Sequence, residues 1–316
     1  MKVRLGYIAS PLTLAPLTYA HTITYTRYQK LEEEKRNIVL DQLLQQNLAL
    51  FEQVLHYNCC NQVYFYRFSH NLVPLATHPN VHFDFVHPYL DKWKKLGNIV
   101  KKHHIRLDTH PSQFCVLNSL QEQVVEASIK DLMFHYQLFQ AMGLPAKVVL
   151  HIGGSFGDKE TAKRRFIQNF LQLPLYLQDM IMLENDDKIF TFEDTLEVAT
   201  ILHIPMVLDY HHYLCHHEQK LTKEYLLAIF KTWNKQPYPP KIHFSSPKSK
   251  KEFRHHSEYI DAEKFFDFLL FLKEVNMDVD IMLECKARDI ALFQLVRQLK
   301  CKKKLIFIND TVFLIP

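Results

Sequence analysis

The sequence predicts an α/β protein, most simply a (β/α)₈ TIM barrel with a C-terminal extension. Eight short apolar runs alternate with about eight segments of helical periodicity, which is the order of elements in that fold. Six of the apolar runs end in a histidine or a carboxylate, and no low-complexity linker or change in composition divides the chain. An open doubly wound sheet has the same alternation and remains the alternative. We therefore expect one domain over residues 1–299 and a basic tail of unknown role over 300–316.

The run KVVLHIGGSFG, residues 147–157, is the most informative stretch of the chain. Residues 148–150 have the pattern of a strand that is buried on both faces, and His151 follows them directly. Three of the six glycines in the chain come next, which indicates a tight turn or a close approach of the backbone to a ligand. A histidine at this point lies at the rim where α/β folds bind ligands.

The other elements follow from the same two periodicities. Apolar residues recur at helical spacing through residues 32–57, and the acidic start of this segment suits a helix N-terminus. We expect strands at 3–9, 62–68, 105–110, 147–152, 180–185, 205–210, 241–245 and 280–285. We expect helices at 32–57, 88–103, 121–142, 159–171, 192–202, 222–233, 261–275 and 290–299. The tail is interpreted as a basic hinge followed by an extended segment.

Composition narrows the class of protein. The net charge of +4 and the pI of about 8.6 are compatible with an anionic partner but do not require one. The six cysteines form no CxxC pair, which favours a reducing cytosol, and the start of the chain has the pattern of a strand rather than a signal peptide. No apolar run is long enough to span a membrane. We expect a monomeric cytoplasmic protein with no membrane partner.

Polar residues at the predicted strand ends form the candidate site. They are His110, His151, Glu184, Asp209, His243 and Glu284, with His212 three residues beyond Asp209 and with His78 and His256 in loops. One histidine at such a position is more often structural than a ligand, but several imidazoles and carboxylates at one barrel mouth would repel each other and lose hydration. Bound cations remove that cost. The donors are nitrogen and oxygen without thiolate, which suits Mn²⁺, Zn²⁺ or Fe²⁺, and their number predicts two or three metal ions, as in phosphodiester hydrolysis.

Several motifs resemble one known family. They are THPSQF (109–114), LHIGGSFGDK (150–159), LENDD (183–187), LDYHH (208–212), KIHFSS (241–246) and MLECK (282–286), together with LGYIASPLTL and SHNLVPLATHP. In this order, over roughly residues 3–288, they resemble the ultraviolet damage endonucleases, whose fold and metal site are similar to those of endonuclease IV. The resemblance implies a metal-dependent barrel, with Mn²⁺ as the favoured ion, that nicks double-stranded DNA immediately 5′ of cyclobutane dimers and (6-4) photoproducts. It also implies a 3′-hydroxyl and a 5′-phosphate as products.

The resemblance implies a role for each matching position. The metal ligands would be His78, His110, His151, Glu184, Asp209, His212, His243, His256 and Glu284, and the catalytic residues Glu184, Glu284 and Lys241. His211 competes with His212, and His255 with His256. We favour His212 because the related nucleases have the Asp-x-x-His spacing, and His256 because the SEYI that follows it fits the family better. Lys241 points to the same face as His243 and is expected either neutral or modified beside the metals, or at the rim on a phosphate.

DNA contacts complete the expected site. The resemblance places Gln113 and Phe114 in the space that the lesion leaves when it is extruded, and Phe114 stands where family members often have tyrosine. Tyr7 is expected either to line the lesion pocket or to pack in the core. Backbone phosphates need cations, and the candidates are Arg67, Lys248, Lys250, Lys251 and Arg254.

Three other functions compete with this interpretation. An abasic-site endonuclease would have the same architecture. A divalent-metal sugar isomerase would need a small closed pocket and fewer ligands, and a lesion-binding protein without catalysis would not need a complete metal set. Nicking of irradiated, depurinated or intact DNA separates these alternatives.

Overall fold

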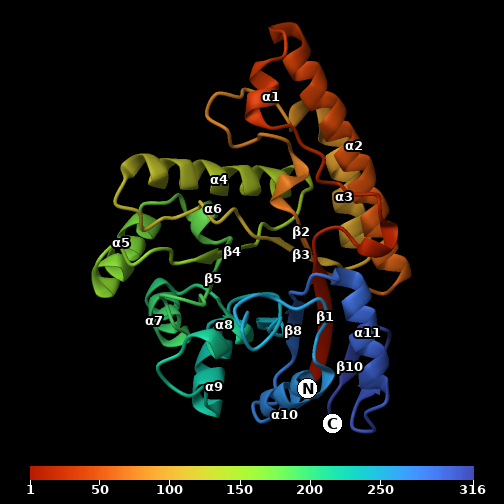
Figure 1. The fold of residues 1–316 in the computed structure, drawn as a ribbon, viewed down its shortest axis with the longest axis vertical. Coiled ribbons are helices and arrows are strands. Elements are labelled where there is room, and N and C mark those ends of the chain that lie inside the picture. Colours follow the sequence, from red (N-terminus) through yellow and green to blue (C-terminus); the bar gives the residue numbers. More distant parts are fainter.

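The computed structural model describes residues 1–316 and shows a closed barrel of eight parallel strands surrounded by helices (Figure 1). The strands are β1 (Lys2–Ile8), β2 (Phe65–Phe68), β3 (Arg106–Thr109), β4 (Val148–His151), β5 (Ile181–Glu184), β6 (Met206–Asp209), β7 (Lys241–Phe244) and β8 (Val279–Leu283). Each pairs in parallel with its neighbour in the chain, and β1 pairs with both β8 and β2, which closes the barrel. The open doubly wound alternative is thereby excluded.

The expected helices are all present, with small shifts of their ends. They are α2 (Glu33–Cys60), α3 (Leu90–Lys102), α4 (Glu122–Ala141), α5 (Lys159–Leu171), α7 (Phe192–Leu202), α9 (Lys223–Lys231), α10 (Ala262–Lys273) and α11 (Arg288–Lys300). The structure adds α1 (Tyr25–Gln29), α6 (Leu175–Gln178), α8 (Tyr210–Cys215) and the 3₁₀ helices η1 (Leu12–Leu14), η2 (His70–Leu72) and η3 (His87–Tyr89). None of the helices is both long enough and apolar enough to cross a lipid bilayer.

The last residues are part of the sheet rather than a detached tail. Two short strands, β9 (Ile306–Phe307) and β10 (Val312–Leu314), form a hairpin, and β10 pairs antiparallel with the start of β1. Phe313 is fully buried, and the amino group of Met1 donates to the carbonyl oxygen of Ile315 at 3.1 Å. The two ends of the chain therefore lie together, as the N and C marks in Figure 1 show.

The inside of the barrel has an apolar side and a charged side. Val149, Met182, Val207 and Trp233 form a separate buried cluster on the side of β4–β6. On the other side, Asp280 accepts from Arg106 at 2.6 Å and from Arg4 Nε at 2.8 Å. Lys241, the register partner of Asp280, donates to Asp108 at 2.8 Å, and both side chains are fully buried. The charges are paired, as burial in a low-dielectric interior demands.

Candidate metal and active site

The carboxyl ends of the strands bring the predicted ligands together in two overlapping groups. One contains His110, His151 and Glu184, and the other contains Glu184, Asp209, His243 and Glu284. Within each group, one possible ligand atom per residue lies within 4.8 Å of all the others. Glu184, on β5, belongs to both groups and therefore has the position of a bridging carboxylate.

The first group is held by backbone carbonyl groups. The Nδ1 atom of His110 lies 3.0 Å from the carbonyl oxygen of Pro111, and that of His151 lies 3.2 Å from the carbonyl oxygen of Glu184. In the neutral imidazole these contacts favour the tautomer with the proton on Nδ1, which leaves the lone pair on Nε2. Both Nε2 atoms face Glu184 Oε2, at 3.3 and 3.4 Å. Lone pairs that face a carboxylate are repulsive, and a cation between them makes the arrangement favourable.

The second group is almost entirely enclosed. Asp209 and His243 are fully buried, and the exposed fractions of Glu184 and Glu284 are 2% and 8%. His243 Nδ1 lies 2.5 Å from Glu184 Oε1 and 3.0 Å from Glu284 Oε1. Burial alone would raise the pKa of Glu184, but His243 and His151 hold it well below its usual value. Burial, together with Glu184 and Glu284, raises the pKa of Asp209.

These donors fit divalent metal ions. Asp209 Oδ2 and His243 Nε2 are buried and have no hydrogen-bond partner, which costs roughly 1–3 kcal/mol for each group. A bound cation would satisfy these atoms and offset the repulsion among three neighbouring carboxylates. The set of imidazole and carboxylate donors without sulfur suits Mn²⁺, Zn²⁺ or Fe²⁺.

Two ambiguous histidine pairs have different surroundings in the structure. His212 Nδ1 lies 3.9 Å from Asp209 Oδ2 and 4.0 Å from Glu184 Oε1, whereas His211 Nε2 is directed to the carbonyl oxygen of Arg254. Burial opposes protonation of His212, but Asp209 and Glu184 raise its pKa to about 9. His256 lies with its ring centroid 6.4 Å from that of His212, while His255 is exposed and contacts Glu252.

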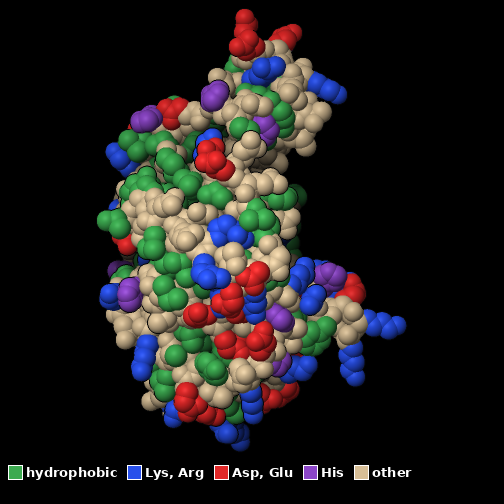
Figure 2. All heavy atoms as spheres, turned by 90° about the vertical axis from the view of Figure 1, so that its left-hand side faces the viewer, with side chains coloured by type: hydrophobic (Ala, Val, Ile, Leu, Met, Phe, Trp, Pro, Cys, Tyr) green, Lys and Arg blue, Asp and Glu red, His purple; other side chains and the backbone are tan.

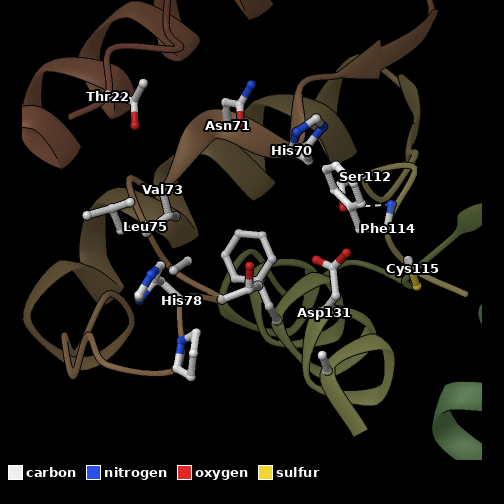
Figure 3. A pocket seen from close by; sticks show the side chains of 15 residues that line it. Thr22, His70, Asn71, Val73, Leu75, His78, Ser112, Phe114, Cys115 and Asp131 are labelled. Atoms are coloured by element: carbon white, nitrogen blue, oxygen red, sulfur yellow. Dashed lines mark hydrogen bonds between the residues drawn. The ribbon is translucent and has the colours of Figure 1, made fainter. Parts of the chain in front are cut away.

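His78 is not brought to either group. Its ring stacks on that of Tyr25 at 3.7 Å, and its Nδ1 accepts from the amide of Asn80. It lines a cavity of about 420 Å³ that lies between the loop after β2 and the loop after β3 (Figure 3). In this structure, His78 is a residue of that cavity rather than a member of the ligand cluster.

Three of the residues with an expected role in DNA contact or catalysis lie inside the protein. Arg67 is only 9% exposed, and its Nη1 atom lies 2.7 Å from Glu284 Oε1. Lys241 is fully buried below the ligands, which rules out the rim position, and burial lowers its pKa to about 8 despite Asp108. Tyr7 is fully buried and donates to Asn58 at 2.6 Å, so it packs in the core.

The loops around the mouth carry exposed side chains, as expected. Gln113 is exposed and Phe114 is 74% exposed, at the edge of the cavity shown in Figure 3. In the loop after β7, Lys248 pairs with Glu252 and Arg254 Nε lies 3.7 Å from Asp187 Oδ2, whereas Lys250 and Lys251 are exposed without an ion pair. On the face shown in Figure 2, basic, acidic and hydrophobic side chains are interspersed.

Sequence reasoning missed two residues that support the ligands. Asn185 accepts from the amide of Asp209 at 2.9 Å and donates to its carbonyl oxygen at 3.0 Å, and its own carbonyl receives His212 Nδ1 at 2.9 Å. Asp108 holds Lys241 in the layer below. The signal for Asp108 was its alternation with His110, which puts both side chains on the inner face of β3. For Asn185 the only signal in the sequence was its position directly after Glu184.

Comparison with known proteins agrees with this geometry. Residues 3–312 match the family described as UV-endonuclease UvdE. The chain belongs to this family. A protein from Bacillus thuringiensis subsp. konkukian named UV DNA damage endonuclease is 40% identical over 301 residues, which is 95% of each chain. The solved structure of SacUVDE superposes with a TM-score of 0.84 at 31% identity and covers 94% of this chain and 98% of that one.

Proteins outside this family have a similar fold. Endonuclease IV from Thermus thermophilus superposes with a TM-score of 0.52 at 14% identity and covers 89% of this chain and 92% of the other. At that identity the likeness concerns the fold alone.

Proposed function

We propose that this protein is a DNA-repair endonuclease that hydrolyses the backbone immediately 5′ of UV photoproducts and leaves a 3′-hydroxyl and a 5′-phosphate. The observation that carries the proposal is the enclosed cluster around Glu184, in a chain that matches the UV-endonuclease family over residues 3–312. Two or three divalent ions, with Mn²⁺ as our first choice, would activate water and neutralise the charge that develops on the phosphate.

The residues of the cluster prepare the site before substrate arrives. His243 Nδ1 contacts Glu184, and Arg67 contacts Glu284. Their side chains therefore need little reorganisation when the phosphate enters, which is the main advantage of a preorganised site. Lys241 acts from below through its ion pair with Asp108, which keeps a balanced charge beneath the ligands.

The exposed loops are suited to a duplex with an opened stack. Reaction at a barrel mouth requires the lesion to leave the helix, and a distorted dipyrimidine costs less to extrude than an intact pair. Gln113 and Phe114 project from the loop after β3 and would occupy the space left behind. The adjacent cavity of about 420 Å³, which His78, Phe114 and Asp131 line, would receive a displaced base (Figure 3).

An assay on supercoiled plasmid tests the proposal. With Mn²⁺, purified protein should nick irradiated plasmid and leave intact plasmid closed. The nicks should support extension by a DNA polymerase without prior end processing, because the 3′ end would be a free hydroxyl. Nicking of depurinated plasmid alone would instead indicate an abasic-site endonuclease, and binding to irradiated DNA without nicking would indicate a recognition protein. Elemental analysis of the same sample gives the metal and its stoichiometry.

A further inference from the structure

The loop after β4 holds an exposed aromatic side chain in an unusual backbone conformation. Phe156 has a φ of +44° and is 42% exposed. Bulky residues rarely adopt positive φ, and such a conformation costs on the order of 1–3 kcal/mol. With 42% of the residue exposed, burial of the ring recovers only part of this cost. Core packing alone therefore does not account for phenylalanine at this position.

The ring is nevertheless held in place. The Arg165 guanidinium lies with Cζ 5.7 Å from the centroid of the Phe156 ring. A Cβ atom at Gly154 would come within 3.0 Å of Cε2 and Cζ of the same ring. Arg165 lies on α5 and is directed toward the loop after β3. Phe156 and Arg165 form an aromatic–cation pair beside the active site.

This pair is tied to the loop that carries Phe114. Asn118 Nδ2 donates to the carbonyl oxygen of Gly154 at 2.7 Å, and Arg165 Nε donates to the carbonyl oxygen of Asn118 at 2.6 Å. A Cβ at Gly153, whose φ is +116°, would lie only 2.3 Å from Asn118 Oδ1. The loops after β3 and β4 therefore form one unit with two exposed rings, Phe114 and Phe156.

We propose that Phe156 is a second residue that stacks on a nucleobase. This base would be one that loses its stacking neighbour when the lesion is extruded, and Arg165, beside the ring, would contact the nearby phosphate. The inference rests on the proposed function, and it follows from the position of Phe156 five residues after the ligand His151. Stacking between a base and an aromatic ring contributes about 1–3 kcal/mol and tolerates any base sequence. Two rings on one rigid unit would stabilise two unstacked bases at once.

The test compares Phe156→Ala with Phe156→Tyr, Phe156→Gly and a matched control, Tyr176→Ala. Tyr176 is 40% exposed and also contacts another ring, but it lies on α6, next to the N-terminal end of β5. We expect Phe156→Ala to raise KM for nicking of irradiated duplex by about 5- to 150-fold. Metal content and kcat should stay the same. Phe156→Tyr should keep the wild-type KM because it retains the ring, and Tyr176→Ala should also leave KM unchanged.

Stability separates a functional ring from a structural one. Because glycine adopts positive φ without strain, Phe156→Gly should leave Tm unchanged or raise it while weakening binding. A fall in Tm of both Phe156→Ala and Phe156→Gly, or a wild-type KM in Phe156→Ala, would overturn the proposal.

A binding measurement keeps this result separate from the proposed function. Fluorescence anisotropy on an unirradiated duplex with a two-nucleotide mismatched bubble does not depend on nicking. If wild-type protein fails to nick irradiated DNA, the proposed function fails. The role of Phe156 still stands if Phe156→Ala binds the bubble more weakly than Tyr176→Ala does, and equal binding by the two variants, or no binding by wild type, would overturn it.

Discussion

The ligand cluster and the loops above it are built in opposite ways. Glu184, Asp209, His243 and Glu284 lie at the ends of hydrogen-bonded strands, and none is more than 8% exposed. Phe114 is 74% exposed and stands on a loop. The cluster is positioned by the strand ladder of the barrel, whereas the loops are positioned by a few side-chain contacts. Catalytic geometry and lesion recognition should therefore respond to different mutations.

The largest effect should come from the residue shared by both groups of ligands. Glu184→Gln removes a charge that the imidazoles of both groups contact, without loss of core volume. We expect nicking of irradiated plasmid to fall by about 1,000-fold or more, with a parallel loss of bound metal. Circular dichroism and Tm of the metal-free protein should match wild type. Retained activity in this variant would remove Glu184 from the mechanism.

Arg67 is buried beside the ligand cluster and should have an intermediate effect. Its guanidinium holds Glu284 at 2.7 Å, so Arg67→Gln releases a ligand without removing it. We expect a loss of about 10- to 100-fold in kcat or metal affinity, the usual range for residues that orient ligands. Arg67→Lys should recover part of the loss. A change confined to KM for DNA would instead support a contact with phosphate.

Discrimination between irradiated and intact DNA should respond to mutations in the loop after β3. In the double variant Gln113→Ala with Phe114→Ala, we expect the preference for irradiated over intact duplex to fall by about tenfold, because at least one stacking contact is lost. Bound metal, measured by elemental analysis, should be unchanged since neither side chain touches the cluster. Loss of metal in proportion to activity would show that the two regions are not independent.

The same contrast explains what could be predicted from the sequence. Strand periodicity predicted the barrel, and it placed six strand-end residues at one mouth, because a parallel ladder brings the ends of its strands together. The depth of each side chain inside the barrel was not predictable from the sequence, since it depends on the register between neighbouring strands. Lys241 pairs with Asp280, and His243 pairs with Met282 one layer higher, so one side chain is buried beneath the cluster and the other joins it.

Prediction from the local sequence also failed where one residue has two structural roles. Asp209 ends β6 and caps α8, because its side chain accepts from the amide of His212. The strand pattern therefore concealed the short helix that begins directly after it. The position of His78 was not predictable for another reason: it sits on a loop whose course is set by contacts such as the stacking on Tyr25, which no periodicity reports.

The smallest effect should come from the lysines of the loop after β7, and it should appear as salt dependence. Lys248 and Arg254 already have acidic neighbours, so Lys250 and Lys251 are the cations free to meet phosphates. Each phosphate contact contributes about 0.9 to the slope of log affinity against log salt. For Lys250→Gln with Lys251→Gln, we expect that slope to fall by about 1.8, equally for irradiated and intact duplex. Lys303→Gln with Lys304→Gln, in the exposed segment before β9, is the matched control and should leave the slope unchanged. A larger loss for irradiated than for intact duplex would mean that this loop reads the lesion and does not merely hold the backbone.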